Sequence, residues 1–148
     1  MNINIFRNAL LREMVVSCLM SLIWVSSYGY RYNLSFFNSP FINWLAFLLW
    51  STGLFITLRT YQFSKFIICP LWLRLPLIWM VYFSVLLVIE YFGYYIFGIR
   101  EMTTEKPLCF GLIHGTLTLK IYYLLAGIAA IFLNHTVKIL GQAFSSQE

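Results

Sequence analysis

Aspartate is absent from this 148-residue chain, and charged residues of all kinds make up only 10% of it. A soluble domain carries about 25% charged residues, so the few charges here cannot cover a water-facing surface. Disorder is also excluded, because disordered chains combine low hydropathy with high charge and 61% of these residues are hydrophobic. A Ser-His-Asp triad would lack its acid, and no Gly-rich phosphate loop or His-Glu-x-x-His motif occurs.

Potential metal ligands are equally sparse. The three cysteines are far apart and form no Cys-x-x-Cys pair, which excludes a disulfide framework and a zinc site. The two histidines, His114 and His135, would lie about 31 Å apart along one helix. They cannot ligate one metal or haem in a monomer, so we predict no metal site, and the sequence identifies no cofactor.

Long apolar runs dominate the chain instead, and about 20 apolar residues suffice for a helix to cross a bilayer. They predict an all-α, polytopic membrane protein with a single domain, residues 1–148, and four transmembrane helices. The expected spans are residues 14–30, 41–58, 75–99 and 108–133. Residues 60–74 carry Lys65, Pro70 and Arg74 among aromatics, so we expect an interfacial segment there. The polar tail, residues 141–148, should be frayed.

The fourth apolar run is longer than a bilayer requires. As one helix, residues 108–133 would extend about 39 Å, against a hydrocarbon core of about 30 Å. We therefore expect the span to begin somewhere within residues 108–117, with a bend near Gly111 and Gly115. The Gly-x-x-x-Gly spacing of these two glycines also favours close helix packing.

The distribution of basic residues predicts the orientation. The net charge is +5, but the Lys and Arg residues are scattered singly, which argues against nucleic acid as a partner. Six of them flank one side of the expected bundle and three flank the other: Arg7, Arg12, Arg59, Lys65, Arg74 and Lys138 against Arg31, Arg100 and Lys106. By the positive-inside rule both termini should be cytoplasmic. The lipid bilayer is thus the first expected partner.

Two ionisable residues, Glu90 and Lys120, fall inside apolar runs, where charge is expensive and suggests function. They lie on consecutive spans and could meet at similar depth. One interpretation is that they neutralise each other and fix the packing of the hairpin. A second is that Glu90 carries protons or contacts a ligand. A third is that the fourth span begins later, so that Lys120 reaches the outer interface and Glu90 is protonated or paired elsewhere.

Other polar groups could join this pair. Tyr94 lies one helical turn from Glu90, and Tyr123 lies on the same face as Lys120. The predicted intramembrane polar cluster is therefore Glu90, Tyr94, Lys120 and Tyr123, with His114 as a further candidate. Each tyrosine could equally be an interfacial anchor, and a lone histidine is commonly a hydrogen-bonded packing residue.

Three functional hypotheses follow. The first is a non-catalytic subunit or assembly partner in a larger membrane complex, which would make other membrane subunits its partners. The second is a small transporter or lipid-handling protein that uses Glu90 on a path between helices. The third is a membrane enzyme acting on a lipid or isoprenoid, with Glu90 and His114 as acid and base. The absence of a catalytic motif favours the first hypothesis.

Overall fold

The computed structural model describes residues 8–27, 42–67, 70–98, 107–114 and 117–145. The chain is all-α in these ranges, as predicted. The helices are α2 (Ala9–Ser27), α3 (Trp44–Ser64), α4 (Leu71–Tyr91), the short π-helix η1 (Phe92–Ile96) and α5 (Leu117–Ser145). Three helical stretches are long and apolar enough to cross a membrane: Ala9–Ser26, Leu71–Ile96 and Lys120–Ala143.

Local sequence signals explain where the helices begin. Asn8 caps α2, because its side-chain oxygen accepts a hydrogen bond from the Leu10 amide at 3.0 Å. Asn43 caps α3 in the same way, accepting from the Ala46 amide at 2.9 Å. Pro70 precedes α4, and a second proline, Pro76, lies inside that helix. Since proline has no N–H, one backbone bond of α4 is lost at Pro76.

Several expected boundaries need correction. Helix α2 begins at Ala9 rather than residue 14, α3 extends to Ser64, and α5 begins at Leu117 and continues to Ser145. The structure does not confirm a separate interfacial segment at residues 60–74. Its first five residues belong to α3 and its last four to α4. Most of the tail expected to be frayed, residues 141–145, is helical.

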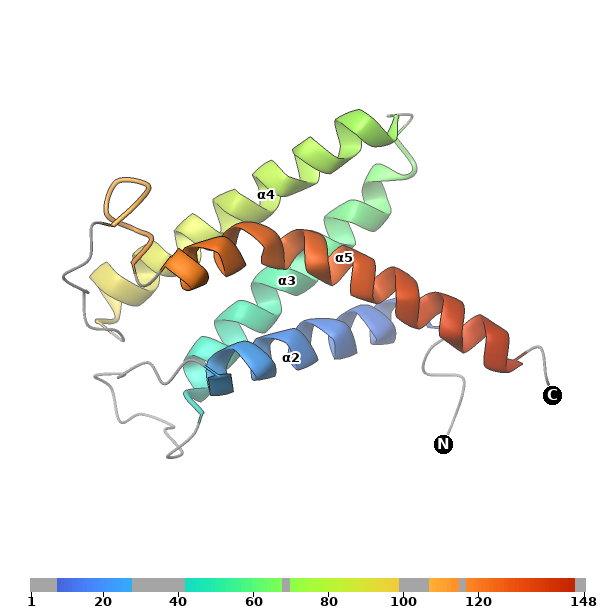
Figure 1. Ribbon diagram of the computed structural model, residues 1–148, viewed down its shortest axis with the longest axis horizontal. Coiled ribbons are helices and arrows are strands. Elements are labelled where there is room, and N and C mark those ends of the chain that lie inside the picture. Colours follow the sequence, from blue (N-terminus) through green and yellow to red (C-terminus); the bar gives the residue numbers. More distant parts are fainter. Residues whose placement is uncertain (1–7, 28–41, 68–69, 99–106, 115–116, 146–148) are drawn as a thin grey trace.

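The four α-helices run back and forth, so that α2 begins and α5 ends at the same end of the bundle (Figure 1). Helices α3 and α5 each pack against all three other α-helices. At the end where α2 begins, α4 and α5 diverge in the view of Figure 1. The other end holds η1 and the start of α5.

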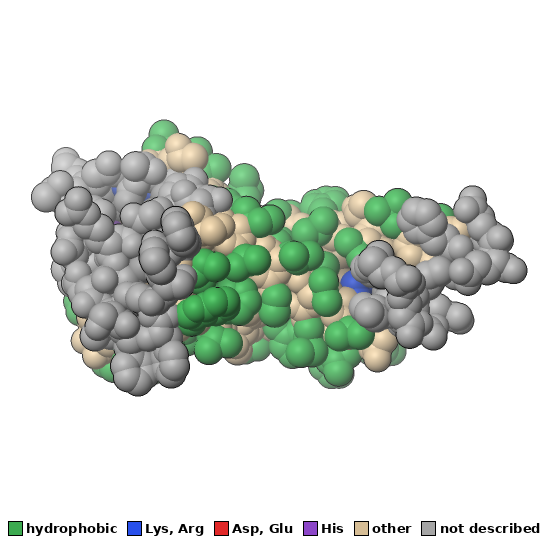
Figure 2. Space-filling view, turned by 90° about the horizontal axis from the view of Figure 1, so that it is seen from below, with side chains coloured by type: hydrophobic (Ala, Val, Ile, Leu, Met, Phe, Trp, Pro, Cys, Tyr) green, Lys and Arg blue, Asp and Glu red, His purple; other side chains and the backbone are tan. Residues whose placement is uncertain are grey.

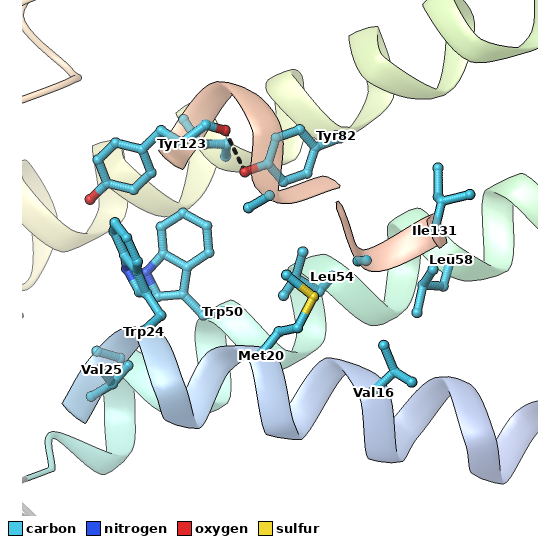
Figure 3. Packing of buried hydrophobic residues seen from close by; sticks show 14 of the residues in the cluster. Val16, Met20, Trp24, Val25, Trp50, Leu54, Leu58, Tyr82, Tyr123 and Ile131 are labelled. Atoms are coloured by element: carbon cyan, nitrogen blue, oxygen red, sulfur yellow. Dashed lines mark hydrogen bonds between the residues drawn. The ribbon is translucent and has the colours of Figure 1, made fainter. Parts of the chain in front are cut away.

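Four aromatic side chains, which we call the aromatic centre, pack together in the core near the end of α2 and the start of α5: Trp24, Trp50, Tyr122 and Tyr123. Trp24 stacks on Tyr122 with 3.7 Å between ring centroids, and Trp50 stacks on Tyr123 at 5.3 Å. Figure 3 shows Trp24 of α2, Trp50 of α3 and Tyr123 of α5 directed toward one another. Stacked rings give specific contacts beyond their buried area, so the aromatic centre joins three helices at one level.

The outside of the bundle is apolar as well. Large hydrophobic side chains are exposed along every helix, and in Figure 2 they cover the middle of one long face. Soluble monomers rarely expose an apolar surface of this extent. The exposed surface therefore fits a hydrocarbon environment, in agreement with the three apolar helices.

Candidate functional site

Glu90 lies at the junction of two helix types. It is the penultimate residue of α4, its side chain is only 2% exposed, and η1 follows directly. The π-type hydrogen bond joins the Phe97 amide to the Phe92 carbonyl at 2.8 Å. Short π-helices occur frequently at functional sites. Here η1 contains Tyr94, which is also buried.

Tyr94 and His114, both members of the predicted polar cluster, lie side by side. Their ring centroids are 4.5 Å apart, and both side chains are buried. His114 Nε2 is 2.7 Å from the Gly111 carbonyl oxygen, which can only accept, so Nε2 donates. In a neutral ring Nδ1 is then an acceptor, and it has no hydrogen-bond partner within the described ranges.

A tight turn holds His114 in place. Leu108 and Ile113 exchange two backbone hydrogen bonds, at 2.9 and 3.1 Å, and Cys109, Phe110 and Gly111 between them all have positive φ. Gly111, with φ 85°, suits this turn because it has no Cβ. The helix-packing role expected of Gly111 therefore does not arise, since this residue is outside any helix. Gly115, the other glycine of that motif, lies outside the described residues.

Lys120 and Tyr123 both lie near the start of α5, but in different surroundings. Lys120 is half-buried. Tyr123 is fully buried, and its ring stacks on Trp50. Its backbone carbonyl oxygen accepts a hydrogen bond from the Tyr82 hydroxyl at 2.6 Å (Figure 3). Its ring therefore belongs to the aromatic centre. The Glu90–Lys120 pair stays a prediction.

The opposite end of the bundle holds polar contacts that the sequence did not lead us to expect. Arg12 Nε donates to Asn134 Oδ1 at 2.8 Å, which joins α2 to α5. Arg59 Nη1 donates to Glu13 Oε2 at 3.2 Å, which joins α3 to α2. Arg12, Glu13 and Asn134 are all buried. The two contacts tie three helices together through charge-assisted hydrogen bonds.

A polar seam continues from this end along α2. Glu13, Ser17 and Ser21 are spaced four residues apart, so they lie on one face of the helix, and all are buried. Glu13 Oε1 and both serine hydroxyls have no hydrogen-bond partner among the described residues. Small serines let helices approach closely in membranes. This four-residue spacing of polar residues is the feature of the sequence from which the buried position of Glu13 could have been predicted.

Further basic residues gather at this end. Although Lys65 lies at the exposed end of α3, its pKa is below the ordinary value. Desolvation by the surrounding protein is the largest cause, followed by the positive charges of Lys138, Arg74 and Arg12, while Glu13 acts in the opposite direction. Cations from the other three α-helices are thus within electrostatic reach of Lys65. With Arg59 they form what we call the basic end: Arg12, Arg59, Lys65, Arg74 and Lys138.

Comparisons with protein-family models, curated proteins and solved structures found no match to this chain. In the described ranges, no group of three or more His, Cys, Asp or Glu side chains could hold a metal ion. Function must therefore be argued from the two polar ends, the aromatic centre and the outer surface.

Proposed function

We propose that this chain is a four-span integral membrane protein in which α3 is the remaining span. Helix α3 has 21 residues, or about 31 Å at the helical rise, which matches a hydrocarbon core of about 30 Å. It packs against the other three helices, so its polar residues can face protein instead of lipid. Buried Ser51 and Thr57 fit this, and Thr57 donates to the Gly53 carbonyl at 2.9 Å.

The same proposal gives the turn between α3 and α4 a place in the head-group layer. Phe66 and Trp72 are 84% and 71% exposed at this turn, and aromatic side chains favour that layer. Within residues 60–74, only the turn and the adjoining ends of α3 and α4 would then lie in the head-group layer. The basic end lies on the same side, which supports cytoplasmic termini by the positive-inside rule.

We infer a non-catalytic role as a subunit or assembly partner of a membrane complex. The observation that supports it best is the aromatic centre, because stacked rings close the interior between α2, α3 and α5. A transporter needs a path between its helices, whereas here stacked rings occupy the space between α2, α3 and α5. At the basic end, Arg12 and Glu13 contact side chains of other helices, which favours a structural use of charge.

The experiment is purification in a mild detergent followed by a mass measurement by light scattering. We expect a particle of defined composition containing this 17.4 kDa chain and at least one other polypeptide. Glu90→Gln should lower the yield of that particle, because it alters a buried side chain at the junction of α4 and η1. Gly93→Ala is the matched control, since an added Cβ would meet no described atom within 4 Å. A stable monomer whose Glu90 reacts with a water-soluble carboxyl reagent would contradict the proposal.

A lipid-handling role is the second candidate, and an apolar groove favours it. The groove has a volume of about 430 Å³ and is open to the outer face between α3 and α4. Gly53 forms part of its wall, with Ile56, Val85 and Ile89 among its apolar neighbours. Such a lining suits an acyl chain. A spin-labelled lipid should be immobilised by the native chain and less so after Ser84→Leu, which enlarges an exposed residue of the groove lining.

A further inference from the structure

Cations outnumber carboxylates at the basic end, counted over the residues that the structure describes. In the described ranges it has five cations, Arg12, Arg59, Lys65, Arg74 and Lys138, and one carboxylate, Glu13, which accepts from Arg59. The difference is four positive charges. In a medium of low dielectric constant such an excess is costly unless anions lie nearby.

These cations come from helices that are distant in the sequence. Arg12 is held by Asn134 of α5, and Arg59 by Glu13 of α2. Lys65, at the end of α3, interacts electrostatically with Arg74 of α4 and Lys138 of α5. The cluster is therefore built by the fold, at the end of the bundle where α4 and α5 diverge (Figure 1).

The length of α5 places the cluster at head-group depth. Lys120 and Lys138 are 18 residues apart on one helix, or about 27 Å, close to the hydrocarbon thickness of about 30 Å. If Lys120 lies near one boundary, Lys138 lies near the other. Exposed Phe66 and Trp72, at the turn beside Lys65, supply the aromatic side chains that favour the same depth.

We propose that the basic end binds the head group of an anionic phospholipid between Lys65, at the end of α3, and the C-terminal half of α5. Basic pockets between transmembrane helices bind such head groups. Buried Arg12 and half-buried Arg59 are already fixed by Asn134 and Glu13. Lys65 and Lys138 are exposed and supply the adaptable donors to phosphate. The proposal rests on the membrane placement above, but it does not require the subunit role.

The test measures the melting temperature of the full chain in a neutral detergent, with phosphatidylglycerol or phosphatidylcholine added in increasing amounts. A ligand that binds only the folded state raises the melting temperature with concentration. We expect phosphatidylglycerol to do so and phosphatidylcholine to have no effect. Inorganic phosphate at equal concentration should also have no effect; if it reproduces the shift, the site takes free phosphate and the lipid proposal is wrong.

Variants of the two lysines connect the effect to this cluster. Lys65→Gln and Lys138→Gln should each weaken phosphatidylglycerol binding about fivefold. That factor corresponds to the binding free energy of about 1 kcal/mol that one lysine or arginine contributes near an anionic membrane surface. Without lipid, Lys65→Gln should leave the melting temperature unchanged or raise it, because neighbouring cations repel Lys65. The charge-preserving Lys65→Arg and Lys138→Arg variants are the matched controls and should retain binding.

Two results would overturn the proposal. One is an equal response to both lipids. The other is a phosphatidylglycerol response that persists in the Lys65→Gln/Lys138→Gln double variant. Lys138→Gln alone, at an exposed position on α5, serves the same comparison if the double variant does not fold. A failure here would leave the light-scattering result on the subunit role unaffected.

Discussion

The ion pair between Glu13 and Arg59 predicts an unequal response to removal of its two partners. The Glu13 side chain is 0% exposed, whereas that of Arg59 is 32% exposed. Arg59→Gln would leave a carboxylate buried without its cation, a change that destabilises proteins by about 3–5 kcal/mol. Glu13→Gln leaves a cation that can turn toward water or lipid head groups, so its effect should be about 0–1 kcal/mol, as for exposed pairs.

The measurement is reversible unfolding in detergent, followed through the fluorescence of the buried tryptophans Trp24 and Trp50. Arg59→Gln should be the more destabilising variant, and the Glu13→Gln/Arg59→Gln double variant should recover most of the loss. Thr60→Ala is a control on the neighbouring residue, whose hydroxyl donates only within α3, to the Ile56 carbonyl at 2.9 Å. If Glu13→Gln were as destabilising as Arg59→Gln, the argument from unequal burial would be refuted.

Two further predictions concern packing against α4. A Cβ added at Gly127 would lie 2.5 Å from Tyr82 Cγ, so Gly127→Ala should destabilise the fold by about 1–3 kcal/mol through overpacking. A Cβ added at Gly53 would lie 2.7 Å from the flexible end of the Ile89 side chain, so Gly53→Ala should have a smaller effect. Equal melting temperatures for these two variants would contradict this. Tyr82→Phe removes the hydrogen bond to the Tyr123 carbonyl and should lower the unfolding free energy by about 0.5–1.5 kcal/mol; an unchanged unfolding curve would show that this bond contributes nothing.

Hydropathy predicted the all-α class and three helices that are long and apolar enough to cross a membrane, because their apolar residues form long runs. It failed at helix ends, where polar residues are satisfied by other helices. The apolar run that follows Arg7 and Arg12 predicts a first span from residue 14, but α2 begins at Ala9. Arg12 and Glu13 can lie inside the bundle because Asn134 and Arg59 bind them. The partners are 122 and 46 positions away in the sequence, so hydropathy along a single segment does not reveal these contacts.

The candidate site was predicted unevenly for a related reason. Residue spacing predicts that Tyr94 lies one helical turn from Glu90 on the same face, and this stays a prediction. The structure shows Tyr94 beside His114. The π-helix that carries Tyr94 leaves no periodic signal, because it lasts only five residues. Tyr123 was assigned to the polar cluster from the Lys120 face, yet its ring stacks on Trp50. Helical spacing identifies a shared face, but not which neighbouring helix that face contacts.

The most direct test asks whether α3 spans the membrane. It compares the sides of the membrane on which the start of α2 and the end of α5 lie. Single cysteines at Asn8, just before α2, and at Gln142, near the end of α5, would be introduced into a chain whose natural cysteines are replaced by serine. Both positions are exposed. With four spans, a membrane-impermeant thiol reagent should label both cysteines from the same side. Labelling from opposite sides would mean an odd number of crossings and would contradict the account.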